Sequence, residues 1–176
     1  VVVGGLSMGG GIALRLAELR PDDVDALVLV NPAIGVRNWQ LKLLPALKWV
    51  VPAMPGIGND IKKAGVDEAG YDKTPLKALA SQVRVWRDTA TGLGDVTAPL
   101  LVFRSTDDHL VDETSLGLIR AGVSSELTQY VTLENSYHVR MPPSAVRSAR
   151  VVARPRSLRW VSTAERAPRS GSPEPG

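Results

Sequence analysis

The chain has 176 residues, of which 44% are hydrophobic and 22% charged, and this balance predicts one globular, water-soluble domain. It contains no Cys, which excludes a disulfide framework, a thiolate nucleophile and a Cys-ligated metal site. Its two His residues, His109 and His138, are too few for a His-rich metal cluster, and the sequence has no run of 18 apolar residues to form a membrane-spanning helix. We therefore expect no bound metal and no stable membrane insertion.

The basic charge of the chain is concentrated at its C-terminal end. The formal net charge is +3, but residues 1–139 carry 13 Lys+Arg against 16 Asp+Glu, whereas residues 140–176 carry eight Arg against two Glu. The body is therefore mildly acidic, and we predict no nucleic-acid partner for it. Residues 140–176 are predicted to be a disordered Arg/Pro-rich tail. Their composition is more typical of out-of-frame translation than of a basic binding arm.

The first residues are typical of the interior of a domain. The chain opens with Val1 in place of Met and begins directly with the β-like segment Val1–Val3. No charged start followed by a longer apolar stretch, the pattern of a signal peptide, is visible. We expect the sequence to begin inside a domain, with the true N-terminus outside it, and we take a cytoplasmic location as the default expectation.

The first 31 residues predict one βαβ unit. Val1–Val3 has the character of a buried strand and is followed by a glycine-rich turn. Beyond the turn, Ile12, Leu16 and Leu19 recur at the spacing of one helix face, which we take as the apolar face of the helix. The continuous apolar run Ala26–Val30 is typical of a parallel strand buried on both faces.

Residues 32–98 interrupt this alternation and are predicted to be a helical cap. Thr74–Pro75 indicates a helix start, with Thr74 as the N-cap and Pro75 at the first helical position. Apolar residues then recur at helical spacing as far as Trp86. The first half of the insertion contains large apolar side chains that indicate either a substrate pocket or ordinary packing within the cap. These candidate pocket residues are Trp39, Leu43, Leu47, Trp49 and Met54.

The α/β alternation resumes in residues 99–139. The pattern predicts a strand over 99–103, a helix over 113–121 and a strand over 127–133. The predicted organisation is therefore an α/β core formed by residues 1–31 and 99–139, a cap over residues 32–98, and a tail. Functional groups in such open sheets gather at the carboxyl ends of the strands.

The motif Gly5-Leu6-Ser7-Met8-Gly9 is the strongest chemical signal in the sequence. It matches G-x-S-x-G, in which a serine occupies a strained turn between a strand and a helix and small residues flank it because the two backbones approach closely. The pattern alone is weak, since glycine and serine cluster by chance. Its predicted position between a strand and a helix supports Ser7 as a nucleophile.

An acid and a base follow at the ends of the two later strands. Asp108 is preferred over Asp107 as the acid because apolar residues follow it two and three positions later. His138 is preferred over His109 as the base because it follows the last strand and completes the chain order Ser, Asp, His. An Asp in a loop is more often a turn or capping residue, and a lone His is more often structural.

The runs GGLSMGGGIALRLA, STDDHLVD and LENSYHV together resemble a serine α/β-hydrolase of the carboxylesterase or monoacylglycerol lipase type. The resemblance covers residues 1–139 and implies Ser7 as nucleophile, Asp108 as acid and His138 as base. It also implies that the backbone N–H of Met8 supplies half of the oxyanion hole. The family's sheet has about eight strands, and the resemblance places only the later four here.

The resemblance implies hydrolysis of a small-molecule ester through an acyl-enzyme, with no cofactor. The apolar residues of the cap indicate a medium-chain acyl ester or a monoacylglycerol. A thioesterase, an acyltransferase and a peptidase share this triad and remain alternatives, as does an inactive fragment or pseudo-hydrolase. The sequence does not indicate an oligomeric state.

Overall fold

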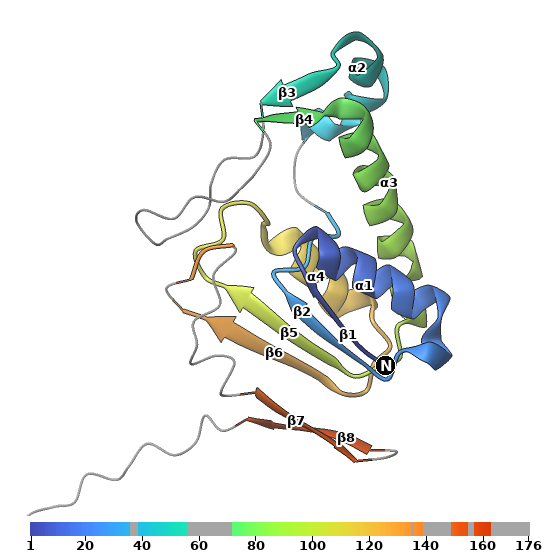
Figure 1. The fold of residues 1–176 in the computed structure, drawn as a ribbon, viewed down its shortest axis with the longest axis vertical. Helices are drawn as coiled ribbons and strands as arrows, with labels where there is room; N and C mark the ends of the chain where they lie inside the picture. The colour runs from blue at the N-terminus through green and yellow to red at the C-terminus, as the bar shows by residue number, and fades with distance from the viewer. Residues whose placement is uncertain (36–38, 56–71, 135, 139–148, 155–156, 163–176) are drawn as a thin grey trace, which may run out of the picture. The chain divides into compact units, whose positions relative to one another are not determined.

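The computed structural model describes residues 1–35, 39–55, 72–134, 136–138, 149–154 and 157–162 (Figure 1). The chain divides into two compact units, Val1–Arg140 and Met141–Gly176, and each is described by itself.

A parallel four-stranded sheet forms the centre of the first unit. Its strands are β1 (Val2–Leu6), β2 (Ala26–Val30), β5 (Leu100–Ser105) and β6 (Thr128–Leu133), in the order β1-β2-β5-β6. The register aligns the carboxyl ends of the strands, since Leu6 is paired with Val30, Val30 with Phe103, and Ser105 with Leu133. Residues that follow these strands therefore leave the sheet at one edge. The prediction of a mostly parallel α/β sheet is confirmed.

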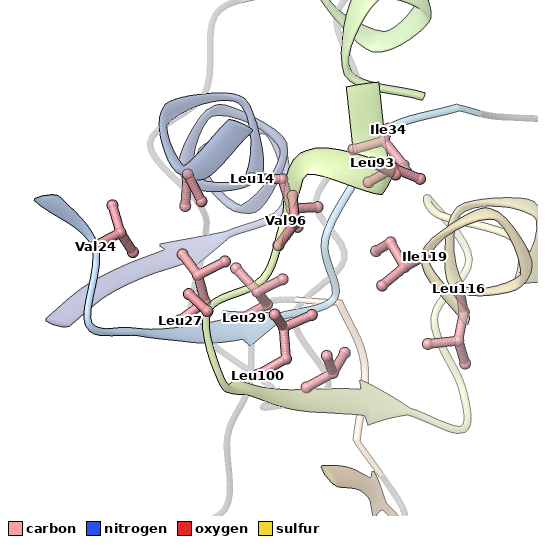
Figure 2. Close-up of a cluster of buried hydrophobic side chains, with 14 residues drawn as sticks. Leu14, Val24, Leu27, Leu29, Ile34, Leu93, Val96, Leu100, Leu116 and Ile119 are labelled. Carbon is pink, nitrogen blue, oxygen red and sulfur yellow. The ribbon is translucent and has the colours of Figure 1, made fainter. Parts of the chain in front are cut away.

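The short 3₁₀ helix η1 (Pro21–Asp23) follows the first helix. The helices α1 (Met8–Leu19) and α4 (Glu113–Gly122) complete the α/β alternation. Figure 2 shows the core that they share with the sheet, in which Leu14 of α1, Leu29 of β2 and Ile119 of α4 contribute buried side chains. Such burial is worth about 1.5–3 kcal/mol for each large aliphatic side chain. None of the helices in the described residues has the length and apolar character that crossing a bilayer requires.

The apolar residues that predict the helix α1 do not face the core that the structure describes. Ile12, Leu16 and Leu19 are 53%, 42% and 60% exposed, and the helix instead buries a side formed by small residues together with Leu14. Helical periodicity identifies residues that share a face, but it does not say which face meets the sheet. Here small residues decide, because a Cβ on Gly11 would lie 2.5 Å from the carbonyl oxygen of Ala33.

The insertion between β2 and β5 consists of short elements followed by a long helix. These are η2 (Trp39–Lys42), α2 (Leu44–Val50), the antiparallel pair β3 (Ala53–Pro55) and β4 (Lys73–Pro75), α3 (Leu76–Gly92) and η3 (Leu93–Asp95). Figure 1 shows α2 and the pair β3–β4 at one end of α3, whose other end lies near α1.

The predicted start of α3, with Thr74 as the N-cap, is wrong. Thr74 lies in β4 and pairs with Met54, and the extended residue Pro75 stands at the N-cap position without a side-chain capping bond. Thr74 therefore belongs to the strand pair β3–β4, although the capping pattern predicts it as the N-cap of the helix. The end of the insertion contributes Leu93, Val96 and Ala98 to the core cluster. The division into a core and a cap over 32–98 stays a prediction.

The second unit contains an antiparallel hairpin of β7 (Ala149–Arg154) and β8 (Ser157–Ser162). This differs from the disorder that composition predicts for residues 140–176. The segment contains Val151, Val152 and Val161, and such β-branched residues favour strands even within an Arg-rich sequence. The terminal Ser/Pro/Gly stretch lies outside the described residues.

Candidate active site

Ser7 occupies the turn between the end of β1 and the first residue of α1. Its backbone angles are φ 51° and ψ −119°, a conformation that costs an L-residue about 1–3 kcal/mol. Two bonds hold it, one to the end of β2 and one to the segment after β2. Ser7 N–H donates to the Val30 carbonyl at 2.9 Å, and the Ser7 carbonyl accepts from Ala33 N–H at 2.9 Å. These bonds therefore hold the backbone of Ser7 in its strained conformation.

The two glycines of the G-x-S-x-G motif have different reasons to be small. A Cβ on Gly5 would lie 2.3 Å from the carbonyl oxygen of Gly9, so any side chain there collides with the helix backbone. A Cβ on Gly9 would meet nothing within 4 Å. Close approach of the backbones thus explains Gly5 and leaves Gly9 without a steric reason.

Asp108 lies in the loop after β5, and its side chain is fully buried. Oδ1 accepts the N–H groups of Leu110 and Val111, each at 2.9 Å. Oδ2 accepts from His138 Nδ1 at 2.8 Å and from Arg104 Nη1 at 2.6 Å. Burial by itself raises the pKa of Asp108. The hydrogen bonds from His138, Val111 and Leu110 and the charge of His138 outweigh burial and hold the pKa below its usual value of 3.8.

His138 follows β6 and is only 5% exposed. When Nδ1–H donates to Asp108, the other ring nitrogen, Nε2, carries the lone pair that a general base needs. The structure thus brings the predicted acid and the predicted base together. Of their rivals, Asp107 donates its backbone N–H to the Ser136 carbonyl, and the His109 ring packs edge-on against Tyr137. The assignment of the three catalytic roles stays a prediction.

Two residues around the Asp108–His138 pair were not found from the sequence. Arg104 lies in β5 and, besides Asp108, binds the Val111 carbonyl through Nη2 at 2.5 Å and the Glu113 carboxylate through Nε at 3.2 Å. A charged residue that interrupts a buried strand, four positions before the acid, was the available signal. The other is Asn31, whose amide binds the His138 carbonyl at 2.7 Å. An Asn directly after a buried strand was the signal there.

Met8 is the first residue of α1. The first N–H groups of a helix have no acceptor within the helix and lie at the positive end of its dipole. This is the position that an oxyanion donor requires, and the role of Met8 stays a prediction.

The role of the five cap residues as a substrate pocket stays a prediction. Leu43, Leu47, Trp49 and Met54 are exposed, and the side chain of Trp39 lies outside the described residues. A cavity of about 150 Å³ lies between η2, α2 and α3. Its lining residues are Leu41, Leu44, Pro45, Lys48, Ala80, Val83, Arg84 and Arg87.

Residues 1–141 match the model of the family described as serine aminopeptidase, S33 (Hydrolase_4). The chain is 34% identical over 146 residues to a thermostable monoacylglycerol lipase of Bacillus sp. (strain H-257). The matched region covers 79% of this chain and 55% of that protein. Among solved structures, one reported for the metagenome-derived lipolytic enzymes LipS and LipT is 33% identical with a TM-score of 0.73, covering 78% of this chain and 56% of that one.

The monoacylglycerol lipase of Paleococcus ferrophilus also has a similar structure, with a TM-score of 0.65 and 18% identity over 78% of this chain and 59% of that one. At that identity the likeness shows the fold alone. The fold of this chain is accordingly that of part of an α/β-hydrolase. The chain spans about half the length of the relatives it matches.

Proposed function

The chain belongs to the serine aminopeptidase, S33 family of α/β-hydrolases, and from this membership we propose that it hydrolyses carboxylic esters with Ser7, His138 and Asp108 as its catalytic triad. The observation that carries the proposal is the 2.8 Å contact between His138 Nδ1 and Asp108 Oδ2, made between two buried side chains. A buried acid–imidazole pair after the last strands is the arrangement that activates a serine hydroxyl.

In the first half of the reaction, His138 Nε2 takes the proton of the Ser7 hydroxyl as Ser7 Oγ attacks the ester carbonyl carbon. The carbonyl π bond opens to give a tetrahedral oxyanion. His138 then returns the proton to the departing alcohol as the ester C–O bond breaks, which leaves an acyl-enzyme. The carboxylate of Asp108 stabilises the imidazolium that forms in this step and keeps Nδ1 protonated throughout.

In the second half, His138 removes a proton from water, whose oxygen attacks the acyl carbon. Collapse of the second oxyanion releases the carboxylic acid, and the proton returns to Ser7 Oγ. The N–H of Met8 is the donor that this chain offers to each oxyanion. Losing one such donor typically costs about 10²–10³ in kcat.

The relative with 34% identity acts on monoacylglycerols by its name. We propose the same substrate class here, with short- or medium-chain acyl esters as the wider range. Serine hydrolases of this fold also cleave thioesters and amides, so the ester preference is tested against both.

The test is hydrolysis by the purified chain of matched ester, thioester and amide substrates that carry the same acyl group. We expect the ester to be cleaved fastest and Ser7→Ala to remove the activity. Ser81→Ala is the matched control, because Ser81 is exposed on α3 and bonds only the Lys77 carbonyl of its own helix among the contacts described. Ester hydrolysis that survives Ser7→Ala, or a preference for the amide, would overturn the proposal.

A further inference from the structure

Asn31 connects the ends of two strands to the backbone of the proposed catalytic base. It directly follows β2, is 1% exposed and has a positive φ of 43°. Its Nδ2 donates to the His138 carbonyl at 2.7 Å and to Ser105 Oγ at 2.9 Å, while its Oδ1 accepts the backbone N–H of Ser105 at 2.8 Å. One side chain thus bridges residues 74 and 107 positions away in the sequence.

The hydrogen-bond network fixes which way the amide points. The Ser105 N–H can only donate and therefore faces Oδ1, whereas the His138 carbonyl can only accept and therefore faces Nδ2. Among side chains of this size, only Asn offers both an acceptor and two donors in this geometry. The same residue type is also the one, besides Gly, that tolerates a positive φ at lowest cost.

The backbone around Asn31 reaches the other side of the site. The preceding carbonyl, that of Val30, accepts the Ser7 N–H, and the N–H of Ala33 donates to the Ser7 carbonyl. The N–H of Asn31 itself donates to the Phe103 carbonyl of β5. The turn at Asn31 therefore holds the backbone of Ser7 on one side, while its side chain holds the backbone of His138 on the other.

We propose that Asn31 is a positioning residue, which fixes the backbone of His138 so that its ring stays aligned between Asp108 and Ser7. The inference rests on the proposed function. His138 follows β6 through a loop, and the Asn31 amide ties its buried carbonyl to the sheet. Without that donor the carbonyl loses a buried hydrogen bond, and the loop is held less firmly to the sheet. Misplacement of a catalytic group by about 1 Å can cost on the order of 10²-fold in rate.

The principal variant is Asn31→Asp, which keeps the shape and the acceptor but replaces the donor with a second carboxylate oxygen that faces the His138 carbonyl. We expect kcat for ester hydrolysis to fall by about 10–10²-fold with KM changed less than about twofold, because the Asn31 side chain is buried and bonds Ser105 and the His138 backbone. Asn31→Gly is the second variant, since Gly accepts the positive φ and removes the amide without burying a charge.

Ser105→Ala is the matched control. It removes the other acceptor of Asn31 Nδ2 from the same buried network and leaves the bond to the His138 carbonyl in place. We expect its kcat to stay within about threefold of the parent. A comparable loss of kcat in Ser105→Ala would mean that the network acts only through stability, and this would overturn the proposal.

A second measurement is independent of turnover. The proton on Nδ1 of a histidine bonded to a carboxylate gives a strongly downfield NMR resonance, and with only two histidines in the chain His109→Ala assigns it. We expect the His138 resonance to weaken or shift upfield in both Asn31 variants and to persist in Ser105→Ala, at a temperature where circular dichroism shows each to be folded. An unchanged resonance and kcat in both Asn31 variants would overturn the inference. Activity that survives Ser7→Ala would instead defeat the proposed function and leave the NMR comparison valid.

Discussion

Arg104 Nη1 lies 2.6 Å from Oδ2 of Asp108, the same carboxylate oxygen that His138 Nδ1 approaches at 2.8 Å. The buried carboxylate is thus shared between a permanent cation and an imidazole. Arg104, which lies in β5, also binds the Val111 carbonyl, so it ties the loop that carries Asp108 to β5. We interpret Arg104 as the residue that keeps the Asp108 carboxylate in place.

Replacing Arg104 with Met should destabilise the protein by about 3–5 kcal/mol, because a buried carboxylate loses its charged partner. Glu113→Gln provides the comparison, since it removes the exposed partner of the same guanidinium and should cost less than about 1 kcal/mol. Urea unfolding of both variants measures the difference. Equal stabilities would show that the Arg104–Asp108 pair contributes little.

Asp108→Asn should make the stability of the protein less dependent on pH. The pKa of Asp108 is lowered in the folded state, so its ionisation stabilises the fold above the unfolded value of 3.8 and this stabilisation is lost as the pH falls through the folded pKa. The parent should therefore exceed the variant in stability at neutral pH, and the gap should narrow in acid. Unfolding curves from neutral pH into acid test this, and a gap that widens in acid would contradict it.

Glu18 should show the opposite behaviour. Burial raises the pKa of Glu18 above its usual value of 4.5 despite the ion pair with Arg15, so ionisation of Glu18 opposes folding. The protonated carboxyl therefore contributes its full stability below pH 4.5, and this contribution is lost as the pH rises through the folded pKa. Glu18→Gln should therefore be more stable than the parent at neutral pH, with the difference disappearing in acid. Thermal unfolding over the same pH range checks the sign. A variant less stable than the parent at neutral pH would mean that the Arg15 pair outweighs burial.

The two glycines of the serine motif should respond differently to alanine. Gly5→Ala places a Cβ against the Gly9 carbonyl and should destabilise the turn strongly, whereas Gly9→Ala has free space and lies in α1. Alanine is favoured over glycine within a helix by about 1 kcal/mol, so Gly9→Ala should preserve or raise the melting temperature. Matching melting temperatures would show that the β1–α1 turn relaxes around a side chain at position 5.

The edge of the sheet should make the isolated chain prone to association. β1 is an edge strand of the described sheet, Val2 on it is exposed, and the outer face of α1 exposes apolar side chains. Exposed apolar edges promote pairing between chains. We expect Val2→Lys to raise the soluble fraction, measured by centrifugation and light scattering. A parent chain that is already soluble and monomeric would contradict this.

The sequence predicted the central strands of the sheet because β2 and most of β5 are continuous apolar runs. The predicted strand Ala26–Val30 has the same bounds as β2. A strand that is buried on both faces is recognised by its unbroken apolar run alone. The orientation of α1 was not predictable from periodicity, because Ile12, Leu16 and Leu19 share a face that the described sheet does not cover. Packing of the glycine side against the segment after β2 decides that orientation, and this contact is not local in sequence.

Local patterns likewise identified candidate catalytic residues but not the residues that support them. Ser7 and His138 stand next to strand ends that the sequence reveals. Asn31 and Arg104 act through contacts that depend on strand order and register. Asn31 contacts Ser105 because β2 and β5 are neighbours in the sheet, and the spacing of residues along the sequence does not predict this strand order.

The most direct test of the proposed triad is labelling of the purified chain with a fluorophosphonate, followed by mass spectrometry to locate the modified residue. We expect stoichiometric modification of Ser7 that is lost in His138→Ala and retained in His109→Ala. Modification of another serine, or labelling of Ser7 that does not depend on His138, would contradict the proposed triad.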